Sequence, residues 1–493
     1  MTSVETFQTL ARPVAVLISP DGEISGDELL TRSHARAAEL RRQGLQYGDL
    51  VICPVDAASP SLTLMQAALA LNNAALLPVP AGLTPTDERN LATQTGANWM
   101  WEPADRPRTG SGCNPGGGQL RALGPSADSS RGEDVARHGS LALVVQTSGS
   151  SGGRKAAMLS AQALYASCER INQRLGLAAN DLWLCALPRQ HIGGLAIGYR
   201  CALAGAGMLL HPGFDAGRVA ADLWRHPVTH LSLVPAMLAR LLDQCPRPPQ
   251  WLRVLLIGGQ ALDSRLAQRA LAAGWPLHLG YGMTETCSFI ASRKLADLDE
   301  AGDGREEGAR GEGGLEPLPD VQLEAPACAS GESPSPLRLR APMLMMGYAN
   351  PRRRPRLGLD ADGWLRTADL ACLSDTSGLR VLGRADDQLV IGGVNVQPGM
   401  IEAQISQCAD VSRCVLVGLP EPVWGHVLVA FYQGAISAAA LDAWCREHLS
   451  SPRRPRLFLP MRDWPLLASG KDNRARLREI AADAWCSRSE SSR

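Results

Sequence analysis

Short apolar runs alternate along the first hundred residues with longer segments in which apolar residues recur every three or four positions. "PVAVLIS" (13–19), "DLVICPV" (49–55) and "ALLPVP" (75–80) are typical of buried strands. Segments 26–44 and 59–74 carry helical spacing and helix-start residues. The pattern therefore predicts an α/β unit for this part of the chain.

A second α/β unit is predicted after residue 140. Its apolar runs predict strands over 181–188, 206–212, 229–235 and 252–259, and the segments between them predict helices such as 235–245 and 263–274. A Gly/Pro/Ser-rich stretch, 105–139, separates the two units and is interpreted as a mobile surface loop. The charged, glycine-rich stretch 297–314 is interpreted as an exposed loop.

Beyond that stretch the pattern changes to short strands and turns, and then returns to mixed helices and strands. We therefore predict an α/β fold with a large N-terminal domain, residues 1–385, made of two α/β subdomains and a small β-rich subdomain. A smaller, mobile α+β domain follows at 386–485, and residues 486–493 are predicted to be a frayed tail.

Charge and cysteine content exclude several classes of protein. Lysine plus arginine equals aspartate plus glutamate, 49 each, so no overall field favours nucleic acid or an anionic membrane. The N-terminus has no basic segment before an apolar one, and no apolar run is long enough to cross a bilayer, which favours a cytoplasmic protein. Thirteen cysteines without a C-x-x-C pair are interpreted as reduced, mostly packed thiols, with neither a disulfide framework nor a zinc site.

The stretch "VVQTSGSSGGRKAAMLS" (144–160) places glycines and hydroxyls between a buried strand and a helix-like segment. Its backbone N–H groups, hydroxyls and cations favour polyphosphate binding over a flexible linker. The Walker spacing is not met, because Arg154 precedes the lysine and Ala156 follows it. The candidate residues are Thr147, Ser148, Gly149, Ser150, Ser151, Gly152 and Lys155.

Four further clusters carry candidate chemistry, and each has an ordinary structural alternative. "GYGMTETCS" (280–288) could stack a base and hold a divalent cation, or it could form a helix cap. Asp369 could accept from ribose hydroxyls or sit in a turn. Residues 383–402 contain Arg384, two aspartates and a Gly-Gly pair, and by themselves they indicate a hairpin and the start of a helix. Lys471 by itself would be interpreted as a surface lysine.

Taken together in this order, the five clusters resemble the motifs of the adenylate-forming superfamily, which includes acyl and aryl CoA ligases. The resemblance covers about residues 10–480. Three positions depart from the usual pattern: Arg154 stands in place of proline, Ala368 in place of glycine, and Gly399-Met400 interrupts the proline-x-glutamate. None of these changes removes an expected catalytic side chain.

The resemblance implies a two-step reaction with ATP, Mg²⁺ and CoA as cosubstrate. It implies catalytic roles for Lys471, His191, Thr284 and Glu285, with Glu285 also the metal ligand and Asp386 the hinge. His191 could equally be a capping residue. The nucleotide and thioester positions implied beyond the phosphate loop are Gly258, Gly259, Gln260, Tyr281, Gly282, Thr284, Asp369, Arg384, Gly392 and Gly393.

Within the superfamily the motifs look most similar to o-succinylbenzoate CoA ligases of menaquinone synthesis and neighbouring aryl CoA ligases. Small residues at Gly193, Gly194, Gly280 and Ser288 favour an aromatic carboxylic acid as the small-molecule substrate. An enzyme that loads a carrier protein is the alternative, and a noncatalytic binding protein is disfavoured because the candidate charged residues are all present. A homodimer is left open, and neither nucleic acid nor membrane is an expected partner.

Overall fold

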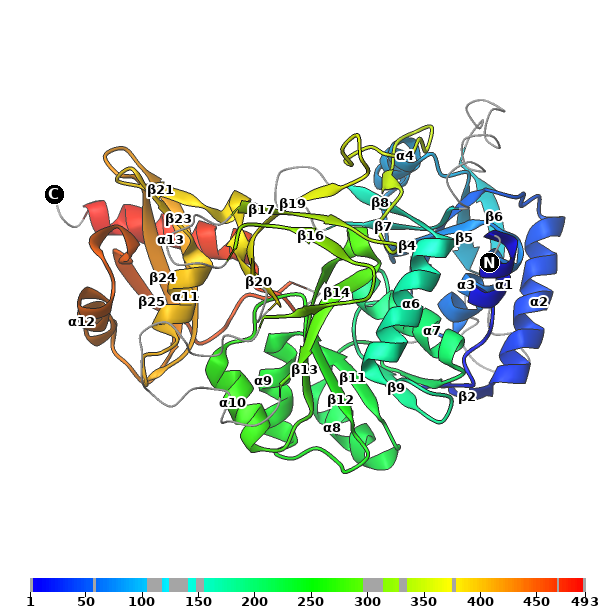
Figure 1. The fold of residues 1–493 in the computed structure, drawn as a ribbon, viewed down its shortest axis with the longest axis horizontal. Coiled ribbons are helices and arrows are strands. Elements are labelled where there is room, and N and C mark those ends of the chain that lie inside the picture. Colours follow the sequence, from blue (N-terminus) through cyan, green and yellow to red (C-terminus); the bar gives the residue numbers. More distant parts are fainter. Residues whose placement is uncertain are drawn as a thin grey trace.

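The computed structural model describes residues 3–55, 59–103, 118–123, 141–147, 155–295, 314–327, 335–374, 378–467 and 470–490. Strands of these residues form sheets of nine, seven, four, three and two strands (Figure 1). Residues 3–384 build the first, second and third of these sheets and are called the N-terminal unit. Residues 389–490, called the C-terminal unit, build the two smallest sheets and lie at the opposite end of the molecule in Figure 1.

The seven-stranded sheet has the order β18-β8-β7-β4-β3-β5-β6. Its strands are β3 (Leu50–Val55), β4 (Ala75–Pro80), β5 (Trp99–Pro103), β6 (Gly118–Ala122), β7 (Leu141–Gln146), β8 (Ala156–Ser160) and β18 (Gly347–Tyr348). The central strands are parallel and covered on both faces, which explains their continuous apolar runs. β6 corrects the prediction of a loop throughout 105–139, because its five residues pair antiparallel with β5.

The nine-stranded sheet has the order β15-β14-β13-β12-β11-β9-β10-β1-β2. Its strands are β1 (Val16–Ser19), β2 (Gly22–Ser25), β9 (Leu182–Cys185), β10 (Gly207–Leu210), β11 (His230–Leu233), β12 (Val254–Gly258), β13 (Leu277–Met283), β14 (Ser288–Lys294) and β15 (Glu316–Pro317). β1 pairs in parallel with β10, so the first strand of the chain belongs to the second unit that the sequence predicted.

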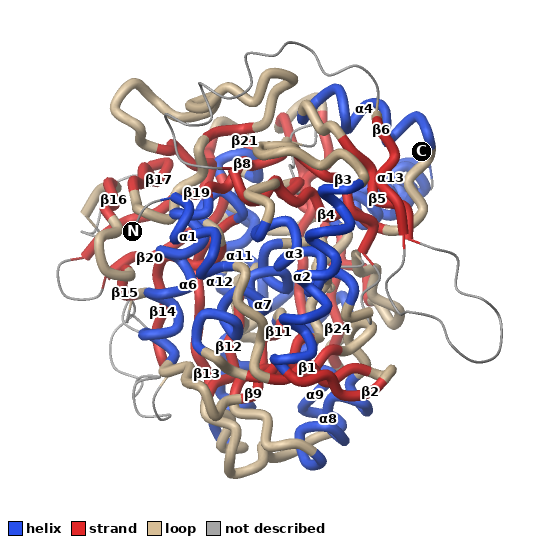
Figure 2. Tube along the Cα trace, turned by 90° about the vertical axis from the view of Figure 1, so that its right-hand side faces the viewer, coloured by secondary structure: helices blue, strands red, loops and turns tan. Residues whose placement is uncertain are grey.

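Helices fill the space between the two large sheets and cover their outer faces. α1 (Ser3–Leu10), α2 (Gly26–Arg42), α3 (Ser61–Leu71), α6 (Ala161–Leu175) and α7 (Ile192–Ala204) share one hydrophobic core with both sheets. Figure 2 shows these helices gathered at the centre of the molecule. α4 (Pro85–Thr95) packs on the other face of the seven-stranded sheet. α8 (Ala216–Arg225), α9 (Pro235–Gln244) and α10 (Ser264–Ala272) pack on the nine-stranded sheet.

A four-stranded antiparallel sheet, in the order β16-β17-β19-β20, follows the two large sheets along the chain. Its strands are β16 (Gln322–Glu324), β17 (Ser335–Arg340), β19 (Leu365–Ser374) and β20 (Gly378–Arg384). This is the small β-rich subdomain that the sequence predicted. It places Asp369 and Arg384 opposite each other in register on neighbouring strands.

The C-terminal unit is a three-stranded sheet with helices on both faces. β23 (Val411–Glu421), β24 (Gly425–Gly434) and β25 (Leu457–Pro460) form the sheet, and β21 (Leu389–Ile391) with β22 (Val394–Val396) forms a separate hairpin. α11 (Pro398–Ile405) and α12 (Ala438–His448) share one core, and α13 (Arg474–Glu490) covers the second. α13 extends five residues into the segment that the sequence suggested as a tail. The α/β fold class that the sequence predicted is confirmed, whereas the limits of the two domains stay a prediction.

Cysteines in the described residues are mostly buried free thiols, as the sequence predicted. Cys372 is an exception, because it forms a disulfide bond, and the prediction of reduced thiols is wrong for it. In the described part of the chain, no helix combines the length and the apolar character that crossing a bilayer requires.

Candidate active site

Thr147 directly follows β7, and Lys155 directly precedes β8, which pairs antiparallel with β7. The Thr147 N–H donates to the Lys155 carbonyl at 2.8 Å. Ser148, Gly149, Ser150, Ser151 and Gly152 lie outside the described residues. The prediction of a helix directly after the loop is wrong, because β8 intervenes and α6 begins only at Ala161. The positive end of the α6 dipole is therefore separated from Lys155 by the five residues of β8.

Lys155 is joined to Glu285 through an aromatic side chain that the sequence reading missed. The Lys155 ammonium lies 4.8 Å from the centre of the Tyr348 ring. The Tyr348 hydroxyl donates to Oε1 of Glu285 at 2.8 Å. Burial, with the Glu285 charge beside it, raises the pKa of Tyr348, so the phenol stays a proton donor. A cation and a carboxylate thus face the same side chain.

Residues 284–287 make a tight turn between β13 and β14. A Cβ atom at Gly282 would stand 2.0 Å from the Ser288 carbonyl oxygen, so only glycine fits there. The Thr286 hydroxyl lies 2.7 Å from the same carbonyl and accepts from the Met283 N–H at 3.1 Å. The turn holds Thr284 and Glu285, both partly buried, between the two strands.

Tyr281 begins a chain of contacts that reaches the candidate hinge. Its hydroxyl donates to Oδ2 of Asp369 at 2.6 Å. Arg384 donates to Oδ1 of the same carboxylate at 3.2 Å and to Asp386 at 2.8 Å. Burial, together with the Asp369 charge, raises the pKa of Tyr281. Four of the predicted site residues, from three separate clusters, are thus in one connected network.

Lys471 belongs to the C-terminal unit but lies against the N-terminal unit at the end of β12. A Cβ atom at Gly259, whose φ is +82°, would stand 3.3 Å from Cε of Lys471. The next residues are also in contact, because the Gln260 amide donates to Asp472 at 3.2 Å. Burial, with the Arg384 cation nearby, lowers the pKa of Lys471. The lysine therefore lies beside Gly259 and Gln260, two of the predicted nucleotide positions.

Three predicted residues lie apart from these contacts. His191 is exposed at the start of α7, and its side chain makes no cap for that helix, so the capping alternative is not met. Gly392 and Gly393 form the turn of the β21–β22 hairpin, with φ values of 58° and 79° that favour glycine. In Figure 1 this hairpin lies at the upper side of the C-terminal unit, away from β12 and β13.

The small residue Gly194 has a packing role that the sequence reading did not foresee. A Cβ atom there would stand 2.6 Å from the carbonyl oxygens of Leu187 and Pro188, so glycine lets α7 approach the preceding chain. At Gly193 the corresponding contact is 3.6 Å, to a Leu187 methyl group. Gly194 therefore gives no support to the prediction that small residues here make room for an aromatic ring.

Arg200 is a buried cation that the motif reading also missed. It is 1% exposed, and its Nε and Nη2 atoms have no hydrogen-bond partner among the described residues. Its guanidinium carbon lies 5.7 Å from the centre of the Phe289 ring, and Phe289 pairs with Gly282 across β13 and β14. Burial lowers the pKa of Arg200. A single arginine inside α7 carries no sequence signal, so only the structure could find it.

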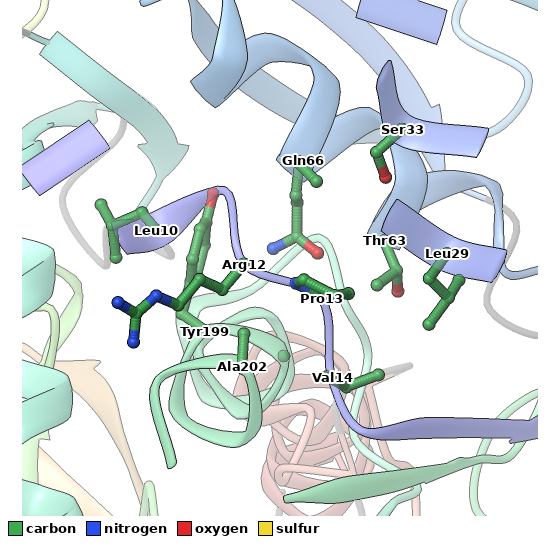
Figure 3. Close-up of a pocket in the computed structure, with 12 residues that line it drawn as sticks. Leu10, Arg12, Pro13, Val14, Leu29, Ser33, Thr63, Gln66, Tyr199 and Ala202 are labelled. Carbon is green, nitrogen blue, oxygen red and sulfur yellow. The ribbon is translucent and has the colours of Figure 1, made fainter. Parts of the chain in front are cut away.

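A separate small hollow lies between α1, α2, α3 and α7. Figure 3 shows Gln66 pointing toward Arg12 and Pro13 in this hollow. It shares no lining residue with the predicted motifs. It is therefore not the candidate active site.

The sequence matches two protein families along most of its length. The AMP-binding enzyme family matches residues 8–348, and the AMP-binding enzyme C-terminal domain matches residues 400–471. A 2-succinylbenzoate–CoA ligase of Enterococcus faecalis is 31% identical over 341 residues, which cover 67% of this chain and 68% of that protein. The corresponding ligase of Bacillus subtilis is 30% identical over 340 residues, covering 69% of this chain and 68% of that protein.

Solved structures share the fold over nearly the whole chain. The o-succinylbenzoate CoA synthetase of Bacillus subtilis in complex with its acyl-adenylate intermediate has a TM-score of 0.77 and 23% identity, covering 97% of this chain and 98% of that one. ATP-bound MatB from Rhodopseudomonas palustris has a TM-score of 0.79 and 22% identity, covering 98% and 100%. At these identities the likeness supports the fold alone.

Proposed function

Because the chain belongs to the AMP-binding enzyme family, we propose that it is an ATP-dependent acid–CoA ligase that forms AMP. The observation that carries this proposal is the contact of Lys471 with Gly259, together with the network of Tyr281, Asp369 and Arg384. Two segments that are far apart in sequence bring a cation to the place where the motifs predict the nucleotide.

In the first step, a carboxylate oxygen of the acid attacks the α-phosphorus of ATP, and pyrophosphate leaves. The obstacle is charge, because an anion approaches a polyanion and negative charge accumulates on the leaving group. Lys471 would neutralise the α-phosphate, and Lys155 with the loop after Thr147 would hold the β- and γ-phosphates. Tyr281 would pack on the adenine, and Asp369 would accept from the ribose hydroxyls.

Mg²⁺ is the metal that the family implies, and the residues present fit it. Among the described residues, no three His, Cys, Asp or Glu side chains gather as a protein-only metal site requires. A single carboxylate, Glu285, fits Mg²⁺, which typically takes one or two carboxylates and completes its shell with phosphate oxygens and water. Tyr348 fixes that carboxylate through its hydrogen bond. When bound, the ion would neutralise phosphate charge.

In the second step, the CoA thiol attacks the acyl carbon, and AMP leaves with the electron pair of the broken C–O bond. His191 is proposed at the acyl and thiol end of the site. The Gly392–Gly393 turn would have to move to reach that end. Asp386, between the two units, is the proposed hinge for that movement.

The proposed acid is 2-succinylbenzoate, the substrate that the names of the relatives from Enterococcus faecalis and Bacillus subtilis give. This acid has two carboxylates, so one can be activated while the other stays ionised. Arg200 supports such a substrate, because two nitrogens of its buried guanidinium have no hydrogen-bond partner among the described residues, which is costly, and an anion would satisfy them. Phe289 beside it offers an apolar contact for the ring.

The test measures ATP–pyrophosphate exchange with 2-succinylbenzoate, a monocarboxylate analogue, aliphatic acids and amino acids, and then thioester formation with CoA or a carrier protein. We expect exchange to be fastest with 2-succinylbenzoate and the thioester to form on CoA. Arg200→Met should raise the KM for 2-succinylbenzoate but not for the monocarboxylate. Exchange only with amino acids, or product only on a carrier protein, would overturn the proposal. A cytoplasmic location, homodimer formation and the absence of nucleic-acid partners stay predictions.

A further inference from the structure

Arg265 joins the two units at a point outside all of the predicted motifs. It is the second residue of α10, in the N-terminal unit. Its Nη1 atom donates to the carbonyl oxygens of Ala409 and Val411, both at 2.9 Å, and its Nη2 atom donates to that of Gln407 at 2.7 Å. All three acceptors belong to the C-terminal unit.

The three acceptors lie just after the end of α11, so their position is set by local structure. Ser406 is the C-cap of α11, and the acceptors follow it, with Val411 already the first residue of β23. The Cys408 N–H donates to Ile405 and the Val411 N–H to Cys408, so the segment 407–411 is a compact turn. A planar guanidinium can reach several such carbonyls at once, which an ammonium group cannot do equally well.

The same turn is connected to the residue beside Lys471. Arg413, two residues beyond Val411 on β23, forms an ion pair with Asp472, and the Trp464 indole donates to that carboxylate at 2.7 Å. Asp472 in turn accepts from Gln260. Lys471 thus belongs to a part of the C-terminal unit that contacts the N-terminal unit at Gln260 and at Arg265.

We infer that Arg265 is a positioning residue: it latches the turn 407–411 and so keeps Lys471 at Gly259 during the adenylation step. This inference rests on the proposed function, since it assigns Arg265 to one of the two half-reactions. Arg265 itself touches no substrate. When the C-terminal unit turns for the second step, the three hydrogen bonds break, so the latch favours the first step only.

The test compares Arg265→Ala and Arg265→Lys with Arg269→Ala. Arg269 is a matched control, because it lies one turn further along α10 and pairs with Asp243 inside the N-terminal unit. We expect Arg265→Ala to slow ATP–pyrophosphate exchange about tenfold to a hundredfold, the effect of losing the three hydrogen bonds of this charged group. The rate of ATP–pyrophosphate exchange of Arg265→Lys should lie between the rates of Arg265→Ala and the wild type. Thioester formation from supplied acyl-adenylate should be unchanged or faster.

Amide hydrogen exchange of residues 407–411 provides a readout that does not need activity. It should quicken in Arg265→Ala and stay as in the wild type in Arg269→Ala, with the same Tm for all variants. Equal losses in both half-reactions, or unchanged amide hydrogen exchange at residues 407–411 in Arg265→Ala, would overturn the positioning role of Arg265. If the wild type itself exchanges no pyrophosphate with any acid, the proposed function fails, and the amide exchange still decides whether Arg265 holds the units together.

Discussion

The two cationic regions of the candidate site are held in place in different ways. Lys155 lies at the start of β8 and faces Tyr348 and Glu285, all within the N-terminal unit. β18, which carries Tyr348, pairs directly with β8, so this half of the site is built into one sheet. Lys471 reaches its place through contacts between two units, such as those of Gln260 and Arg265.

This difference indicates that the two halves of the active site have different roles in the reaction. The half that is fixed by strand pairing suits the phosphates, which must be held throughout the first step. The half that contains Lys471 is held by side-chain contacts at a partly exposed interface. It can move away when its step is complete, because each such contact contributes only about 1 kcal/mol to the stability of the interface. Variants that alter one half and not the other therefore test whether the two halves act in different steps.

Glu285→Gln should have the largest effect on the fixed half of the site, because it removes the only carboxylate that we assign to Mg²⁺. We expect adenylation to fall about a thousandfold and the Mg-ATP requirement to rise, a loss typical of removing a key electrostatic group. ATP–pyrophosphate exchange over a range of Mg²⁺ concentrations measures both effects, and circular dichroism checks the fold. Turnover near the wild-type rate would place the metal elsewhere.

Asp386→Pro should affect the opposite step. Proline fixes φ at the proposed hinge, so the C-terminal unit should stay with Lys471 at Gly259. We expect thioester formation to fall about a hundredfold while pyrophosphate exchange persists, the effect expected for a blocked conformational step. Asp386→Ala is the control, because it removes the carboxylate that pairs with Arg384 but leaves the backbone free. If Asp386→Ala lost as much as Asp386→Pro, the hinge assignment would be wrong.

Tyr281→Phe should have a smaller effect on the fixed half. It keeps the ring but removes the hydroxyl that donates to Asp369. We expect the KM for ATP to rise about tenfold, because the ribose carboxylate loses one strong hydrogen bond. Steady-state kinetics with varied ATP measures the change. An unchanged KM would separate Asp369 from the nucleotide.

The smallest effect concerns the pH dependence of adenylation, which involves the half of the site that contains Lys471. The pKa of Lys471 is lowered below the 10.5 of an ordinary lysine, chiefly by burial. Adenylation needs the charged form, so exchange should fall on the alkaline side at a pH below 10.5, and Lys471→Arg should shift that fall upward. Between the folded and unfolded pKa values the folded state binds fewer protons, so the contribution of Lys471 to stability rises with pH there. An alkaline limb that Lys471→Arg does not move would assign it to another group.

The buried strands could be predicted from the sequence, but their arrangement into sheets could not. β3, β4 and β12 follow from apolar runs that only a strand buried on both faces needs. The pattern predicts β8 as the start of a helix, because "AAMLSAQALYASC" has no break between Ser160 and Ala161 that separates a strand from a helix by pattern. β1 joins β10 across about 190 residues of chain, and no local signal specifies such pairing.

The candidate site was predictable where chemistry and glycine geometry coincide. Gly282 and the Gly392–Gly393 turn leave a sequence signal, because a Cβ atom at Gly282 would clash with Ser288 and the positive φ values at Gly392 and Gly393 favour glycine. Tyr348, Arg200 and Arg265 leave none, because each acts through a contact made by distant parts of the chain. They could not be distinguished from ordinary core or surface residues before the fold was known.

Lys471→Ala tests most sharply whether the two halves of the site differ in this way. We propose that the half with Lys155 and Glu285 is fixed, and that the half with Lys471 is in place for the first step only. The measurement follows both half-reactions on the same preparation: ATP–pyrophosphate exchange with 2-succinylbenzoate, and conversion of supplied acyl-adenylate and CoA to thioester. We expect exchange to be abolished while thioester formation continues near the wild-type rate. Equal loss of both half-reactions would contradict the account.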